Sequence, residues 1–115
     1  MARTILIVDD FAPFRDSARS LLEAEGFAVV GEAEDGAEAL RLVEELRPEI
    51  VLLDVQLPDF DGFEVARRLR DFDPHPEVIL ISSREDYRAL VRQSDARAFL
   101  RKDELSGETL AAALG

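Results

Sequence analysis

One stretch decides the fold of this chain: Ile50-Val51-Leu52-Leu53-Asp54-Val55-Gln56-Leu57-Pro58-Asp59-Phe60-Asp61-Gly62. Four aliphatic residues run directly into a carboxylate, with Pro48 before the run and Pro58 after it. A short apolar run bounded in this way is typical of a strand buried on both faces of a sheet. Such a strand has no use for an acid in its interior, so Asp54 is expected at its carboxyl end. Ligands bind at that edge of open parallel sheets, which makes Asp54 the first candidate for a functional residue.

On both sides of this stretch, other apolar runs also end on polar residues. The further predicted strands, with the residues that follow them, are Thr4–Val8 with Asp9-Asp10, Ala28–Ala33, Val78–Ile81 with Ser82-Ser83, and Ala98–Leu100 with Arg101-Lys102. The second of these is weaker and more polar than the others, which suits an edge strand.

Helical spacing of apolar residues separates these strands. The predicted helices run from Ala12-Pro13 to Gly26, from Asp35-Gly36 to Leu46, from Phe63 to Phe72, over Tyr87–Ser94 as a short helix, and onward from a Ser106 cap. Five strand–helix units in succession predict an α/β fold with a doubly wound, five-stranded parallel sheet. The whole chain, residues 1–115, is expected to form one domain.

Composition narrows the function classes. The net charge of −11, from 25 acids and 14 bases, argues against direct nucleic-acid binding, because phosphate backbones need a basic face. The absence of cysteine excludes disulfides, thiolate catalysis and cysteine-based zinc sites. No apolar run approaches the ~20 residues of a membrane span, and the start shows no signal peptide, so a cytoplasmic protein is expected.

The strand ends bring separate acids together. If the strand order is 2-1-3-4-5, the first and third strands flank the switch point, which would place Asp9, Asp10 and Asp54 in one crevice. Each pair of carboxylates at ~5 Å costs roughly 3 kcal/mol at an effective dielectric of ~20, so a cation must offset the repulsion. A hard divalent ion with oxygen ligands, Mg²⁺ above all, fits this role, and Lys102 adds a second positive charge.

This set of residue types suits phosphoryl transfer. Asp54 is a candidate nucleophile, since carboxylates form aspartyl-phosphates. Ser82 would donate its hydroxyl to a phosphoryl oxygen, and Lys102 would neutralise another. Taken singly, the acid pair is common in loops and helix caps, the serine in turns and the lysine in solvent. Their joint placement at four strand ends favours a site.

With these residues in view, the chain resembles a response-regulator receiver domain, the phosphoacceptor half of two-component signalling. The resemblance covers essentially the whole chain and implies a flavodoxin-like fold with the strand order 2-1-3-4-5. It is carried by four segments, Ile5–Asp10, Val51–Glu64, Ile79–Ser83 and Ala98–Lys102.

The resemblance implies a role for each site residue. Asp54 would be phosphorylated by a sensor histidine kinase or phosphotransfer protein. Asp10 would bind Mg²⁺ directly, together with Asp54 and the backbone carbonyl of Gln56, while Asp9 would act largely through water. Lys102 would contact the phosphoryl group.

The resemblance also implies a switch. On phosphorylation Ser82 would swing inward and Phe99 would follow, altering the surface around the fourth helix, fifth strand and fifth helix; a plain core aromatic is the alternative for Phe99. Gln56 and Arg84 stand where side chains tune autodephosphorylation, although Arg84 fits an ordinary solvated arginine equally well. A downstream output domain, a target protein or a homodimer would read the change.

Several positions depart from the family pattern. Asp103 follows the lysine where proline is common, so we expect a trans bond and a shifted entry to the last helix. The interval from Ser82 to Lys102 is a residue or two short, and Asp95 stands where glycine is common. The Ser-Ser and Lys-Asp pairs resemble receivers that precede a helix-turn-helix domain, and the chain is either part of a longer regulator or a stand-alone one.

Three functions remain in competition on these grounds. The first is a phosphorylation-controlled switch that catalyses only its own phosphorylation and dephosphorylation. The second is a pseudoreceiver, an interaction domain that is never phosphorylated, against which stands the intact set of acids, serine and lysine. The third is a Mg²⁺-dependent phosphohydrolase. Such enzymes carry an acid–base aspartate two residues after the nucleophile, where this chain has Gln56.

Overall fold

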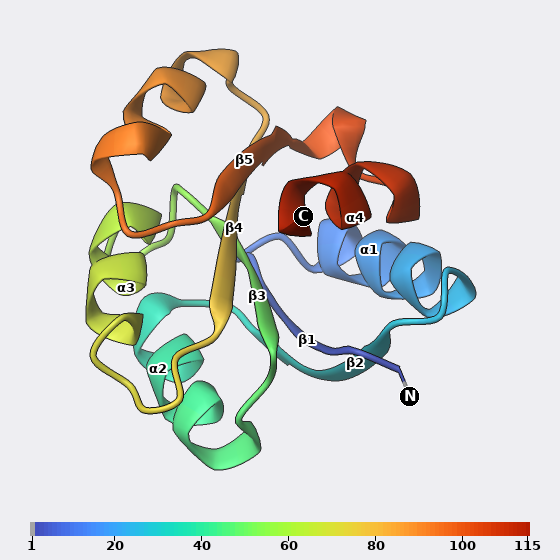
Figure 1. The fold of residues 1–115 in the computed structure, drawn as a ribbon, viewed down its shortest axis with the longest axis horizontal. Coiled ribbons are helices and arrows are strands. Elements are labelled where there is room, and N and C mark those ends of the chain that lie inside the picture. The colour runs from blue at the N-terminus through green and yellow to red at the C-terminus, as the bar shows by residue number, and fades with distance from the viewer. Residues whose placement is uncertain (1) are drawn as a thin grey trace.

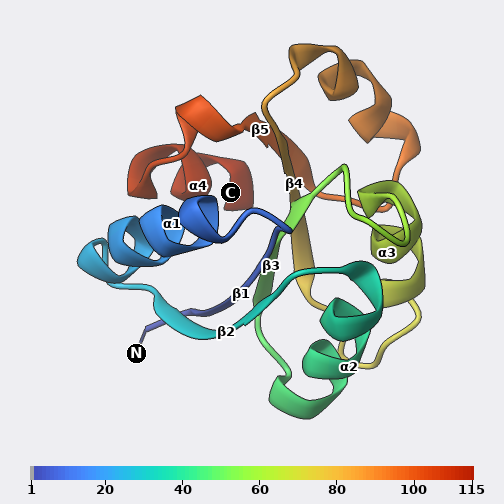
Figure 2. The same ribbon diagram turned by 180° about the vertical axis from the view of Figure 1, so that it is seen from behind.

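The computed structural model describes residues 2–115 as a parallel sheet covered by helices on both faces (Figure 1, Figure 2). The elements, with η for a 3-10 helix, are β1 (Thr4–Val8), α1 (Ala12–Ala24), β2 (Ala28–Ala33), α2 (Gly36–Leu46), β3 (Ile50–Asp54), α3 (Gly62–Leu69), β4 (Glu77–Ser82), η1 (Glu85–Gln93), β5 (Ala98–Arg101), η2 (Lys102–Glu104) and α4 (Gly107–Leu114). The strand order β2-β1-β3-β4-β5 confirms the predicted doubly wound topology.

The sheet separates two apolar layers. Helices α1 and α4 cover one face, and α2, α3 and η1 cover the other (Figure 1). Successive side chains of a strand point to opposite faces, so each apolar run supplies both layers. The strand residues under α1 and α4 include Ile5, Ile7, Ile50, Leu52, Ile79 and Ile81, and those under α2 and α3 include Leu6, Val8, Val51, Leu53, Val78 and Leu80. This explains why the runs are continuously apolar rather than alternating.

Short polar side chains start three of the helices. Asp35, Asp61 and Ser106 are the N-caps of α2, α3 and α4, and each accepts a hydrogen bond from the backbone N–H three residues further on, at 2.8 to 3.0 Å. Pro13 lies in the first turn of α1, where its missing N–H is not needed. The predicted starts at residues 12, 35 and 106 are therefore confirmed.

The third helix is shorter than predicted: α3 ends at Leu69, so Phe72 lies in the following turn and packs against the core from there. The predicted end of the second helix at Leu46 is confirmed, and Leu46 is 40% exposed. Within the described residues 2–115, no helix combines the length and apolarity needed to cross a bilayer.

The predicted fourth helix is wrong in kind. The segment is a 3-10 helix of 9 residues, Glu85–Gln93, with none of its side chains buried; Leu90 is exposed and Ser94 lies outside the helix. A 3-10 helix rises ~2.0 Å per residue against ~1.5 Å for an α-helix, so it covers a given length with fewer residues. The short interval between Ser82 and Lys102 therefore explains the tighter form. Only Tyr87 and Val91 pack partly against the core.

Candidate functional site

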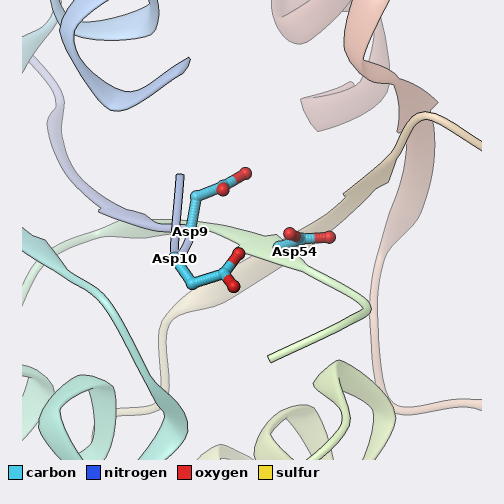
Figure 3. A group of neighbouring side chains, drawn as sticks. All are labelled: Asp9, Asp10 and Asp54. Atoms are coloured by element: carbon cyan, nitrogen blue, oxygen red, sulfur yellow. The ribbon is translucent and has the colours of Figure 1, made fainter. Parts of the chain in front are cut away.

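The carboxyl ends of the strands place the predicted site residues side by side. Val8 pairs with Leu53 in the register between β1 and β3, so the acids that follow Val8 lie beside Asp54. One carboxylate oxygen from each of Asp9, Asp10 and Asp54 lies within 4.8 Å of the other two (Figure 3). Asp9 and Asp54 are buried, whereas Asp10 is exposed to solvent.

Lys102 joins the acids from the end of β5. Its Nζ lies 2.6 Å from Oδ2 of Asp9 and 3.3 Å from Oδ2 of Asp54. The buried Oδ2 of Asp9 lacks a partner in good hydrogen-bond geometry, although the ammonium is within ion-pair distance. The centre of the Phe14 ring lies 4.7 Å from the ammonium, within the range of a cation–π interaction. Burial lowers the pKa of Lys102, but the two carboxylates outweigh it and raise the pKa above its ordinary value.

Asp54 differs from an ordinary aspartate in its proton affinity. Burial, followed by repulsion from Asp9, raises the pKa of Asp54 from 3.8 to about 6, against the opposing effects of Lys102 and the backbone N–H of Gln56. That N–H donates to Oδ1 of Asp54 at 3.2 Å. A nearby cation stabilises the ionised form of a carboxylate that is crowded in this way. Three acids with oxygen ligands, one of them open to solvent, fit a hard divalent ion that keeps several waters.

The turn after β1 is held by contacts that the sequence did not indicate. The N–H of Phe11 donates to Oδ1 of Asp9 at 2.8 Å, and Arg15 donates to the backbone carbonyl of Asp9 at 2.6 Å. Arg15 also pairs with Glu32 on β2 at 3.0 Å. Neither Arg15 nor Glu32 belongs to a recognisable motif, since only the parallel pairing of β1 and β2 brings them together.

Asp59 holds the loop after β3, and the sequence did not indicate this role either. Its carboxylate accepts from the N–H groups of Gly36 and Ala37 at 2.7 and 2.9 Å, so it docks the loop on the start of α2. These bonds and that of the Phe60 N–H hold the pKa of Asp59 below its ordinary range, although burial raises it. The sequence shows Asp59 next to Pro58 and Gly36 at the start of a distant helix, but no local pattern connects these two residues.

The residues expected to switch or tune the site lie at its edge. Ser82 is buried, and its Oγ accepts from the N–H of Arg84 at 3.1 Å. The Arg84 guanidinium pairs with Asp86 at 2.6 Å and lies 5.2 Å from the centre of the Tyr87 ring, so it packs against the first turn of η1. Phe99 is 4% exposed and packs with the core under α3, in line with either of its two interpretations.

Comparison with known proteins then decides the family. A family model described as the response regulator receiver domain matches residues 5–114. The chain belongs to this family. This receiver domain is 35% identical over 108 residues to the transcriptional regulatory protein YdfI of Bacillus subtilis, covering 92% of the chain and 50% of YdfI. It is 37% identical over 83 residues to the chemotaxis protein CheY of Bacillus subtilis, covering 72% of the chain and 69% of CheY.

Solved structures agree with the family assignment. The signal receiver domain of NarL from Mycobacterium tuberculosis superposes with a TM-score of 0.85 at 34% identity, over 99% of this chain and 98% of that one. A chain of the CheX–CheY–BeF3–Mg complex from Borrelia burgdorferi superposes with a TM-score of 0.83 at 27% identity, over 97% of this chain and 86% of that one. The receiver domain spans about half the length of the curated transcriptional regulators it matches, as with YdfI.

The raised pKa of Asp54 predicts a pH dependence of the metal-free receiver domain. Between pH 3.8 and about 6 the unfolded chain loses the Asp54 proton while the folded chain keeps it, so folded protein binds more protons. The contribution of Asp54 to the free energy of unfolding therefore falls as pH rises through that window, by on the order of 2 kcal/mol. The check is urea unfolding of wild type and Asp54→Asn in chelator from pH 4 to 7. The free energy of unfolding of Asp54→Asn, relative to that of wild type, should rise with pH across the window. A difference in free energy that stays constant with pH would contradict the raised pKa.

Proposed function

We propose that this receiver domain is a phosphorylation-controlled switch whose phosphoacceptor is Asp54. The observation that carries the proposal is the position of Asp54, buried beside two other acids with the ammonium of Lys102 3.3 Å from its Oδ2. The phosphodonor is the phosphohistidine of a sensor histidine kinase or phosphotransfer protein. The family assignment supports this class of donor.

The acid cluster supports Mg²⁺ as the cofactor. Asp10, Asp54 and the backbone carbonyl of Gln56 would hold the ion, and Asp9 would act largely through water. When bound, Mg²⁺ supplies positive charge against the phosphoryl oxygens and the carboxylates. The Mg²⁺ named in the CheX–CheY–BeF3 structure belongs to that relative and agrees with the choice of metal.

The transfer step follows from the chain's own groups. One oxygen of the ionised Asp54 carboxylate attacks phosphorus and forms the new P–O bond, while the P–N bond of the phosphohistidine breaks. The electron pair of that bond leaves with the imidazole nitrogen, which takes a proton from water. Lys102, already beside Asp54, pairs with a phosphoryl oxygen, and the Ser82 hydroxyl donates to another.

The output would arise on the face formed by η1, β5 and α4. Movement of Ser82 towards the phosphoryl group would free space that Phe99 fills, which shifts a population between two packings. Gln56 and Arg84 would tune the lifetime of the acyl phosphate. Because the curated relatives include transcriptional regulators about twice as long, we propose that an output domain, a target protein or a second copy reads this face.

The proposed switch catalyses only its own phosphorylation and dephosphorylation. A phosphorylation-independent pseudoreceiver would have no need of the complete set of acids and lysine that converge here. A phosphohydrolase would need an acid–base group near the nucleophile, and Gln56 occupies that position. These features favour the switch over both alternatives.

A small phosphodonor separates the three functions. Wild type and Asp54→Asn are incubated with acetyl phosphate, with Mg²⁺ or with chelator, and intact masses are recorded. The switch predicts one labile phosphoryl group on wild type with Mg²⁺ and none on the variant. No adduct on wild type would favour the pseudoreceiver, and sustained hydrolysis of an added phosphomonoester would favour the hydrolase.

Mg²⁺ is expected to stabilise the fold, because it relieves the repulsion among Asp9, Asp10 and Asp54. At ten times its Kd, a ligand that binds only the folded state adds about 1.4 kcal/mol to the free energy of unfolding. Thermal melts over a Mg²⁺ titration measure the effect, with Asp54→Asn expected to respond less than wild type. An unchanged melting temperature at saturating Mg²⁺ would argue against a metal site in this cluster.

A further inference from the structure

The turn that carries Lys102 is closed by a neighbouring side chain. The chain passes from β5 straight into η2 through a trans bond before Asp103, as expected from the missing proline. Oε1 of Glu104 accepts a hydrogen bond from the backbone N–H of Arg101 at 2.8 Å. This bond spans Lys102, so it fixes the backbone on both sides of the lysine.

The same oxygen also ties this turn to η1. Nη2 of Arg88 donates to Oε1 of Glu104 at 2.6 Å, and its Nη1 lies 3.4 Å from the carbonyl oxygen of Phe99. The Arg88 guanidinium also lies 5.2 Å from the centre of the Phe99 ring. Arg88 therefore contacts β5 on one side of Lys102 and η2 on the other. Asp103, by contrast, is largely exposed, and within residues 2–115 its side chain pairs only with that of Arg101, at 2.8 Å.

The position of the Lys102 ammonium depends on the backbone of this turn. The side chain of Lys102 is a flexible stem that must reach back past Phe14 to put its Nζ 2.6 Å from Asp9. A displacement of its Cα by about 1 Å is enough to lose such a contact, and misplacement of that size lowers reaction rates as much as 100-fold. Proline, which stiffens the backbone by fixing φ, is absent after Lys102.

We propose that Glu104 is a positioning residue for phosphotransfer: it holds the η2 turn, with Arg88 as its partner on η1, so that Lys102 points at Asp54. The proposal rests on the proposed function of Asp54. Glu104 contacts no reacting atom and acts only through the lysine. The bond between Arg88 and Glu104 also joins η1, part of the proposed output face, to the turn that carries Lys102.

The test compares rates of phosphorylation by acetyl phosphate at saturating Mg²⁺. Glu104→Ala is expected to lower the rate constant about tenfold, with the Kd for Mg²⁺ within twofold of wild type. Glu104→Gln should restore most of the rate, because its amide oxygen can accept both hydrogen bonds. Arg88→Ala should lose less than Glu104→Ala, since the Arg101 N–H bond remains. Glu108→Ala, an exposed acid on the next helix, is the matched control and should equal wild type.

A variant background separates positioning from a general effect on the fold. In Lys102→Ala protein, added Glu104→Ala should leave the residual rate unchanged, because the residue it acts through is gone. A Glu104→Ala rate equal to wild type, or the same proportional loss with and without Lys102, would overturn the proposal while leaving Asp54 as phosphoacceptor. Absence of phosphorylation in wild type would overturn both.

Discussion

Lys102→Ala is expected to lower the free energy of unfolding of the metal-free protein by about 3 kcal/mol at neutral pH. Asp9 and Asp54 are 0% and 5% exposed, and the ammonium is the cation closest to both. Removing one partner of a buried ion pair leaves an uncompensated charge, which typically costs about 3–5 kcal/mol. Loss of Lys102 would raise the pKa of Asp54 further, so that Asp54 takes up a proton more readily, and Lys102 is partly exposed; both place this case at the low end. Lys102 is the only lysine of the chain, so no other ammonium replaces it.

Urea unfolding in chelator and in saturating Mg²⁺ measures this effect. Mg²⁺ should restore most of the loss, because it supplies the missing positive charge to the same carboxylates. Arg101→Ala is the matched control: its ion pair with Asp103 lies on the surface, so a change below ~0.5 kcal/mol is expected. A Lys102→Ala protein as stable as wild type in chelator would show that the two buried acids are not balanced by the lysine.

Gly62→Ala is expected to destabilise the protein by about 3 kcal/mol and to slow phosphorylation. A Cβ at this position would lie 2.5 Å from the carbonyl oxygen of Asp54 and 2.9 Å from Cα of Val55. Both are backbone atoms, one in the last residue of β3 and one in the residue after it, so the start of α3 or Asp54 itself must move. Overpacking of this kind costs typically 1–3 kcal/mol.

Gly31→Ala provides the matched control. Its Cβ would also come within 2.9 Å of another atom, but that atom is Cδ1 of Leu46, at the end of a side chain that is 40% exposed. Cδ1 of the buried Leu6, at 3.2 Å, would have to shift by only a few tenths of an ångström. A loss below ~1 kcal/mol and a normal phosphorylation rate are expected. Chemical unfolding and the acetyl phosphate assay measure both variants. Equal behaviour of the two variants would refute the view that glycine at position 62 lets α3 start directly against the end of β3, where Asp54 lies.

The sequence was sufficient to predict the sheet and the residues at its edge. Buried parallel strands leave continuous apolar runs, and the runs of β1, β3, β4 and β5 lead into the polar residues of the candidate site, as Asp54 and Lys102 show. The strand order was less independent, since it came from the pattern of receiver domains as well as from the crossover rules. The N-caps at Asp35 and Ser106 were predicted because capping depends on residues three apart in sequence.

What the sequence did not indicate depends on contacts between distant segments. Asp59 meets the start of α2, Arg15 meets the carbonyl of Asp9, and Glu104 meets Arg88 only after the sheet has formed. The 3-10 form of η1 was missed for a related reason. Its apolar spacing fits an α-helix, and the length available between β4 and β5 overrides that preference.

Location of the phosphoryl group by chemical trapping tests the proposed switch most directly. Wild-type protein is phosphorylated with acetyl phosphate and Mg²⁺, the acyl phosphate is reduced with borohydride, and the peptides are sequenced by mass spectrometry. The structure predicts homoserine at position 54 alone, with no product in chelator or in Asp54→Asn protein. Homoserine at Asp9, Asp10 or Asp59, or no trapped product in wild type, would contradict the assignment of Asp54 as the phosphoacceptor.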